Sequence, residues 1–190
     1  RVYTAEELTR IGELCVKHDV VILSDEIHGD LVYKPHKHIH IAALDEAFAR
    51  RTVTFTAPSK TFNLAGLVGS YHIAYSPWIR DRMEKECSLS HYDSMNVLSM
   101  HALIAAYSPE GSEWADELCA VLAGNIDFAC NYIKTRFDGV EVTKPEGTYI
   151  LFADCTKWCE AHGKTIDDVE RACWDVGVAV QDGRQFHGPC

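Results

Sequence analysis

The sequence predicts an α/β fold, in which a mainly parallel sheet flanked by helices is followed by a smaller α+β region. A helical pattern over residues 4–18 leads directly into an apolar strand pattern over residues 20–24. A second strand pattern, rich in β-branched and aromatic residues, covers residues 51–55. Helices that alternate with strands are typical of a parallel sheet, in which ligands bind at the carboxyl ends of the strands.

The first helix has a clear start signal. Thr4 is a candidate N-cap and Glu7 follows three residues later, which is the pattern of a capping box. Apolar residues then recur at helical spacing, namely Leu8, Ile11, Leu14 and Cys15. We therefore expect an amphipathic helix that ends near His18.

The remaining elements follow from the same periodicity rules. Pro109-Glu110-Gly111 is expected to separate two helices. The expected order is a strand over 70–75, helices over 78–86, 93–107 and 113–137, strands over 139–143 and 148–152, a helix over 166–175 and a strand over 178–181.

The composition excludes several classes of protein. The chain carries 18 basic against 28 acidic residues, a net charge of -10, so it lacks the concentrated positive charge that nucleic acids require. No apolar run approaches the ~20 residues that span a bilayer. The eight cysteines contain no Cys-x-x-Cys pair, and we expect buried thiols in a reducing compartment. These features predict a soluble, cytoplasmic protein with no nucleic-acid or membrane partner.

Lys60 is the candidate for covalent chemistry. It follows the strand pattern at residues 51–55 after a turn signal at Pro58. An amine that is partly desolvated at a strand end has a lowered pKa and can attack a carbonyl to form a Schiff base. The alternative is an ordinary solvated lysine, and Lys60 by itself leaves both interpretations open.

Asp25 gives Lys60 a chemical context. It ends the apolar strand pattern at residues 20–24, so two adjacent parallel strands would bring Asp25 and Lys60 to the same edge of the sheet. Pyridoxal phosphate requires such a pair, because a carboxylate keeps its ring nitrogen protonated while a lysine holds its carbonyl carbon. Asp25 could instead cap a helix or form a structural ion pair.

The two motifs resemble a known family. Ser-Asp-Glu-Ile-His at 24–28 and Ser-Lys-Thr-Phe-Asn-Leu-Ala-Gly-Leu at 59–67 are similar to motifs of the fold-type I aminotransferase superfamily, specifically its cystathionine β-lyase-like branch of carbon–sulfur lyases (MalY/PatB type). The resemblance implies pyridoxal 5'-phosphate as cofactor, Lys60 as the catalytic residue that binds it, and Asp25, His28 and Ser59 as further cofactor-binding residues. His28 stands where aminotransferases usually carry tyrosine, and a surface histidine is its alternative.

The resemblance also implies a helix over 41–49 and a domain organisation. In this family a long helix leads from a large cofactor-binding domain into a small one, so we place the boundary near Gly124. Residues 1–124 would be the C-terminal portion of the large domain, and residues 125–190 part of the small C-terminal domain. The family's upstream Asn-Pro loop, phosphate loop and stacking aromatic are missing from the sequence. We therefore expect a piece of a longer protein, and whether this piece holds the cofactor by itself stays open.

Some positions depart from the family pattern. Val68 stands where the family often has a phosphate-binding arginine, and Ala57 replaces the usual serine, which leaves the Ser59 hydroxyl as a possible donor. Arg184 lies in a loop that resembles the one preceding the substrate-carboxylate arginine, but it is not itself that arginine.

We expect no metal site. His36, His38 and His40 would lie on one side of an extended segment, yet no carboxylate or cysteine is expected close enough to complete a ligand set. Cys155 and Cys159 have a helical spacing without partners for zinc.

The function implied by the resemblance is a β-lyase that acts on cystathionine or cysteine-type amino acids and releases thiol, pyruvate and ammonia. Three alternatives stay open: an aminotransferase that uses the same residues, a regulatory or interaction protein on the same fold, and an inactive fragment. Members of the family are homodimers, so a homodimer with a small amino-acid substrate is expected.

Overall fold

The computed structural model describes residues 1–91 and 94–186, which divide into two compact units. Unit 1 comprises residues 1–120 together with 146–148, and unit 2 comprises residues 121–145 and those from 149 onward. The division falls close to Gly124, but the short segment 146–148 belongs to unit 1 although it lies beyond that residue. The assignment of residues 1–124 and 125–190 to a large and a small enzyme domain stays a prediction.

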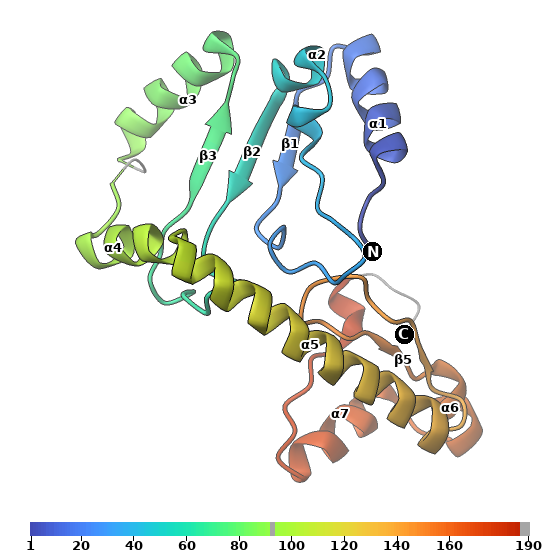
Figure 1. Cartoon of the computed structure of the whole chain (residues 1–190). Helices are drawn as coiled ribbons and strands as arrows, with labels where there is room; N and C mark the ends of the chain where they lie inside the picture. Colours follow the sequence, from blue (N-terminus) through green and yellow to red (C-terminus); the bar gives the residue numbers. More distant parts are fainter. Residues whose placement is uncertain (92–93, 187–190) are drawn as a thin grey trace. The chain divides into compact units, whose positions relative to one another are not determined.

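A three-stranded sheet organises unit 1. Its strands are β1 (Ile22–Asp25), β2 (Thr52–Thr56) and β3 (Tyr71–Ala74), in the order β1-β2-β3 (Figure 1). β1 and β2 are parallel, as the sequence predicts, whereas β2 and β3 are antiparallel. The described sheet is therefore mixed rather than mainly parallel. The reason is that turns connect β2 to β3, without the helix that usually carries a parallel crossover.

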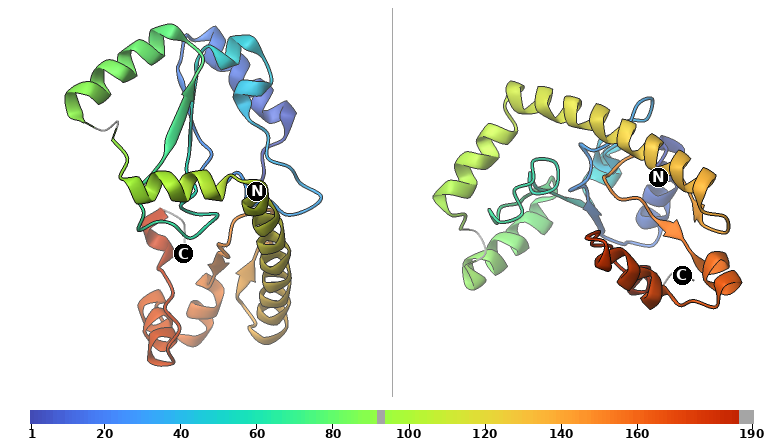
Figure 2. Two further views of the ribbon diagram at one scale, coloured as in Figure 1. Left: turned by 60° about the vertical axis from the view of Figure 1, so that its left-hand side comes forward. Right: turned by 90° about the horizontal axis from the view of Figure 1, so that it is seen from below.

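α2 (Glu46–Ala49) and the 3-10 helix η1 (Ile41–Ala43) contact the central strand β2, and α1 (Ala5–Lys17) packs on α2 and η1. All three lie near β1 and β2 (Figures 1 and 2). The predicted capping box of α1 is present. The single helix expected over 41–49 is instead two pieces, because the Asp45 side chain accepts a hydrogen bond from the Ala47 amide and starts a new helix there.

The core of this region lies where α1, α2 and β2 meet. Phe48 and Val53 are buried, and residues 52–54 are buried at three successive positions because β2 is the central strand. A Cβ at Gly12 would come within 2.7 Å of the Phe48 ring, so the close approach of α1 to α2 depends on glycine there.

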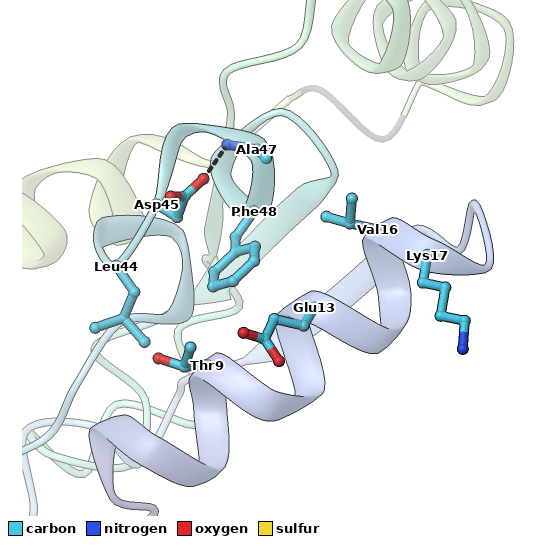
Figure 3. A pocket seen from close by; sticks show the side chains of 8 residues that line it. All are labelled: Thr9, Glu13, Val16, Lys17, Leu44, Asp45, Ala47 and Phe48. Atoms are coloured by element: carbon cyan, nitrogen blue, oxygen red, sulfur yellow. Dashed lines mark hydrogen bonds between the residues drawn. The ribbon is translucent and has the colours of Figure 1, made fainter.

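A surface cavity of about 380 Å³ lies between α1 and α2 (Figure 3). Thr9, Glu13, Val16 and Lys17 of α1 face Leu44, Asp45, Ala47 and Phe48 across it. None of these eight residues belongs to the motifs at 24–28 and 59–67, so this cavity is separate from the predicted site.

Three further helices follow the sheet. α3 (Pro77–Ser90) lies beside β3 and is longer than the predicted 78–86, and α4 (Val97–Ala106) begins at the N-cap Asn96. Asp93, where the sequence predicted the start of that helix, lies outside the described residues. α5 (Pro109–Arg136) leads from unit 1 into unit 2.

The predicted break between two helices is present, but it falls at residues 107–108 and not at Pro109-Glu110-Gly111. Pro109 is the first residue of α5, a position that tolerates proline because the amide there has no helical partner. A Cβ at Gly111 would collide with the Ala106 carbonyl, so glycine serves the tight connection between α4 and α5 and does not end a helix.

Unit 2 is largely helical. It contains the antiparallel pair β4 (Glu141–Val142) and β5 (Ala153–Asp154), together with α6 (Thr156–His162), α7 (Ile166–Asp175) and the 3-10 helix η2 (Gly183–Phe186). α7 has the predicted bounds and a capping box formed by Thr165 and Asp168. α6 was not predicted. Among the described residues of unit 2, Ile126 and Cys130 are the buried ones.

Two predicted strands are absent from the described residues. The strand expected over 148–152 does not form, because the preceding residues pair in unit 1, where Gly147 bridges Val32 and the Thr148 amide donates to the Leu31 carbonyl at 2.7 Å. Residues 178–181 are also not a strand, and there the Val180 carbonyl accepts a hydrogen bond from the indole of Trp174.

The cysteines agree only in part with the expectation of buried thiols. None of the seven described cysteines forms a disulfide, but only Cys130 is buried and the others are half-buried. Among the described residues, every helix is too short or too polar to cross a bilayer.

Candidate active site

Two turns leave the sheet of unit 1 at the same edge. The first turn, residues 26–31, follows β1, and the second turn, residues 57–64, follows β2. β1 and β2 are parallel and pair Asp25 with Phe55, so their carboxyl ends lie side by side. Asp25 is the last residue of β1 and Lys60 lies in the second turn. The parallel pairing thus brings both residues to one edge of the sheet.

Lys60 is exposed, flanked by buried neighbours. Ala57 and Thr61 are 3% and 1% exposed, and the Thr61 hydroxyl donates a hydrogen bond to Asp30 at 3.0 Å. The expectation of a partly desolvated amine is therefore wrong for this chain, because burial in this turn falls on the residues around the lysine. The backbone is anchored while the amine stays accessible.

Asp25 and His28 both interact with the charge of Lys60. Asp25 is exposed, and its carboxylate accepts a hydrogen bond from the Ile27 amide at 3.2 Å. His28 is half-buried in the first turn. Burial lowers the pKa of His28, the Lys60 ammonium lowers it further, and the Asp25 carboxylate raises it. The three predicted residues therefore lie close enough to influence one another electrostatically.

Ser59, the fourth predicted residue, is half-buried beside Lys60. Its carbonyl accepts a hydrogen bond from the Leu64 amide at 3.0 Å, and the Pro58 carbonyl accepts one from the Phe62 amide at 2.9 Å. These two bonds close the second turn around Lys60.

An aromatic cluster supports the second turn. The Phe62 ring stacks on Trp114 with centroids 5.5 Å apart and meets Tyr107 edge-on at 6.0 Å. Tyr107 in turn contacts Tyr71 of β3. Burial raises the pKa of Tyr107 to about 12, so the phenol stays neutral. The cluster holds the residue two positions after Lys60 against α4 and α5.

The expectation that no carboxylate lies near the histidine-rich segment is wrong. Glu26, with a side chain only 4% exposed, contacts both His38 and His40 through one oxygen. The His38 Nε2 lies 2.8 Å from Glu26 Oε2, and Ser24 donates to the other oxygen at 2.8 Å. Burial raises the pKa of Glu26, but hydrogen bonds from His38, Ser24 and His40 outweigh it, so the pKa lies below its ordinary value. His36 is separate, 3.8 Å from Glu146.

A second cavity of about 250 Å³ lies against the first turn. Asp25, Glu26, His28 and His38 are among the residues that line it, and Lys60 is not. Two of the predicted residues therefore border this cavity, while the lysine is exposed outside its lining.

Sequence reasoning missed the residues that position the site. Thr61 and Asp30 form a hydrogen bond across 31 positions, and no local pattern signals that pairing. Glu26 lies in the motif at 24–28, but its partner histidines lie 12 and 14 positions later. The alternation of His38 and His40 was visible in the sequence, and only the fold identifies the carboxylate that they face.

Comparison with known proteins gives a consistent result. The model of the aminotransferase class I and II family matches residues 1–189. Cystathionine β-lyase PatB of Bacillus subtilis is 33% identical over the whole chain, which covers 48% of that protein. An aspartate aminotransferase of the same organism is 30% identical over 98% of this chain, and the match covers 47% of the aminotransferase.

A solved structure agrees with these relatives. Cystalysin from Treponema denticola, whose structure contains pyridoxal 5'-phosphate, superposes with a TM-score of 0.85 at 30% identity, over 98% of this chain and 46% of that one. The chain thus spans about half the length of the relatives it matches, and pyridoxal 5'-phosphate is the cofactor that these relatives indicate. The resemblance to fold-type I enzymes with a carbon–sulfur lyase branch is confirmed. By the extent of this match, the chain belongs to the aminotransferase class I and II family.

Proposed function

We propose that the protein contributes the lysine-bearing part of a pyridoxal-phosphate-dependent β-lyase. It would act on cystathionine or cysteine-type amino acids and release thiol, pyruvate and ammonia. The observation that carries the proposal is the exposed Lys60 amine at the same sheet edge as the Asp25 carboxylate. The 33% identity to a cystathionine β-lyase supports the choice of substrate class.

The donor set in the described residues fits the cofactor. An accessible primary amine and an accessible carboxylate are the two groups that pyridoxal phosphate needs from a protein, and Lys60 and Asp25 are both exposed. The interaction of His28 with both charges indicates that all three groups lie within electrostatic range. Ser59, next to Lys60, offers a hydroxyl for the phosphate.

Each residue would have one role. Lys60 would hold the cofactor covalently and, once released by substrate, would take the Cα proton. Asp25 would accept a hydrogen bond from the ring nitrogen and keep it protonated, and His28 would contact the cofactor near its phenolic oxygen. When bound, the cofactor supplies an electron sink for the electrons left at Cα. A thiolate at Cβ could then leave.

An aminotransferase is the second candidate. The 30% identity to an aspartate aminotransferase over almost the whole chain favours it, and the same four residues would serve. The products distinguish the two reactions. A lyase yields pyruvate, ammonia and a thiol without a second substrate, whereas an aminotransferase requires an oxo-acid acceptor.

Several finer expectations belong to the same proposal. Residues 1–124 would be part of a large cofactor domain and residues 125–190 part of a small α+β domain. The protein would work as a cytoplasmic homodimer on a small amino acid. A regulatory or interaction protein on this fold, or an inactive piece, would share the Lys60 placement but would release no thiol.

Replacement of Lys60 tests the proposal. In the intact protein, Lys60→Ala is expected to abolish the visible absorbance band of the covalently held cofactor and the release of thiol from cystathionine. Lys85→Ala, which removes an exposed lysine on α3, is the matched control and should leave both unchanged. A Lys60→Ala protein that keeps the band would remove Lys60 from this role. If the wild-type protein has the absorbance band and releases no thiol, but transfers the amino group to an added oxo-acid, the function is that of an aminotransferase.

A further inference from the structure

Glu26, His38 and His40 bring three metal-binding groups together outside the residues used in the proposed reaction. Their ligand atoms, one from each side chain, all lie within 4.8 Å of one another. His38 and His40 alternate along the chain, so both imidazoles lie on the same side of the segment and meet edge-on with centroids 4.7 Å apart. Both contact the same oxygen of Glu26.

The surroundings hold this cluster in place. The Ser24 hydroxyl fixes the other Glu26 oxygen at 2.8 Å, and the Glu26 amide donates to the Phe55 carbonyl of β2 at 2.9 Å. A Cβ at Gly29 would lie 3.1 Å from the His38 Nε2, so the ring approaches the first turn closely because residue 29 is glycine. Partners that orient metal ligands in this way are a regular feature of metal sites.

The geometry requires little change to bind an ion. Bonds of about 2.0–2.2 Å in a tetrahedral zinc site place neighbouring ligand atoms roughly 3.3–3.5 Å apart. The His38 contact with Glu26 is shorter, at 2.8 Å, and all three ligand atoms lie within 4.8 Å of one another, so small movements of the side chains would give that spacing. The His40 side chain is 62% exposed and can adjust, whereas Glu26 is buried and held.

The ligand types select the class of ion. Two imidazoles and one carboxylate suit zinc and similar divalent transition metals, whereas magnesium and calcium prefer oxygen ligands. Three protein ligands leave a position for water, and the cavity of about 250 Å³ that Ser24, Glu26 and His38 help to line offers space for it.

We propose that Glu26, His38 and His40 form a binding site for a divalent transition-metal ion, with zinc as the physiological candidate. The ion replaces the direct contacts of the two imidazoles with Glu26 and links residues 38–40 to the first turn. Since Glu26 directly follows Asp25, the ion stabilises the segment that presents Asp25 and His28. This site does not depend on the proposed lyase reaction.

Zinc titration of the purified protein without a histidine tag tests the site. Isothermal calorimetry is expected to show one Zn²⁺ per chain in competition with a weak chelator, and the melting temperature should rise with added zinc because the ion binds the folded state. Mg²⁺ at the same concentration should show no such binding and should not raise the melting temperature. His40→Ala should weaken zinc binding by at least about tenfold, and Ser24→Ala by roughly 10–100-fold, since it removes a group that orients a ligand.

His36→Ala is the matched control, because His36 lies on the same segment but pairs with Glu146 instead. It should bind zinc as the wild type does. In EDTA, His40→Ala is expected to melt below the wild type, because the buried Glu26 carboxylate loses one hydrogen-bond partner. The effect of zinc on each variant is therefore measured against the melting temperature of the same variant in EDTA. His38→Gln is a second variant with the same expected loss of zinc. The proposal is overturned if wild type binds no zinc, if His40→Ala and His38→Gln bind it as tightly as wild type, or if His36→Ala loses as much affinity as they do.

Discussion

The first and second turns reach the same edge of the sheet by different physical means. In each, an exposed group adjoins a buried polar residue, which is Glu26 after Asp25 and Thr61 after Lys60. Glu26 is a carboxylate held by two imidazoles and a hydroxyl, whereas Thr61 is a neutral hydroxyl with one partner, Asp30. The first turn is therefore anchored by a buried carboxylate, and the second by a buried hydroxyl that donates to a carboxylate of the first turn.

The difference indicates which changes each turn tolerates. The first turn is tight, since the Gly29 amide donates to the Glu26 carbonyl and the Leu31 amide to the His28 carbonyl. The second turn is wider and depends on buried neighbours and on the aromatic cluster around Phe62. Replacement of the Glu26 carboxylate should affect the first turn, and loss of the Thr61 hydroxyl or of the aromatic contacts should affect the second.

The largest expected effect comes from Leu31→Ala at the end of the first turn. Leu31 is fully buried, so truncation should lower the free energy of unfolding by about 3 kcal/mol, within the usual range for a buried leucine. Chemical denaturation measures this. Leu23→Ala, at a leucine that is 71% exposed on β1, is the control and should change stability far less. Equal losses in both variants would show that Leu31 does not anchor the turn.

Glu26→Gln tests the charged anchor. It keeps the size of the side chain but weakens hydrogen bonds that involve a charged acceptor, so we expect a loss of about 2 kcal/mol in metal-free protein. Glu13→Gln on α1, an exposed position, should stay within about 0.5 kcal/mol of the wild type. Unchanged stability in Glu26→Gln would mean that charge does not hold the first turn.

Thr61→Val tests the hydroxyl that anchors the second turn. The replacement keeps the branched shape and removes the hydrogen bond to Asp30, and the expected loss is about 1 kcal/mol. Thr61→Ser keeps the hydroxyl and should retain the bond. If serine destabilises more than valine, methyl packing rather than the hydrogen bond anchors this turn.

The smallest expected effect is a change in the pKa of His28. This histidine of the first turn interacts with the charge of Lys60 in the second turn. Its pKa should lie below the ordinary value of about 6.5, as followed by NMR in metal-free protein. Lys60→Met should raise this pKa, because a repelling charge is removed, and Asp25→Asn should lower it further. A His28 pKa that is unaffected by both variants would contradict the electrostatic contact between the turns.

The sign of the stability effect follows from the same shift. Because the folded state disfavours protonated His28, its contribution to stability is present above the unfolded pKa of about 6.5 and is lost as pH falls through the lower folded pKa. His28→Gln should flatten the pH dependence of unfolding in that window. Unfolding curves measured below and above it would reveal the change.

Much of the local structure was predictable because it depends on short-range patterns. The capping box at Thr4 and Glu7 and the apolar run into Asp25 correctly located α1 and β1. The prediction failed where a distant contact competes with a local signal. Residues 146–148 pair with residues near Leu31 instead of starting a strand. The break between α4 and α5 was predicted two residues too late for a local reason, because proline is also favoured as the first residue of a helix.

In the candidate site, too, the residue types were predictable from local patterns and the contacts between distant residues were not. Lys60, Asp25, His28 and Ser59 could be named as candidate site residues from the amino-acid sequence, because their types and spacing match a family motif. Tertiary structure decided that Lys60 is exposed while Thr61 is buried, and that Glu26 faces His38 and His40. Burial and pairing between residues 12 to 31 positions apart depend on how strands and turns pack, and a linear pattern carries no record of that packing.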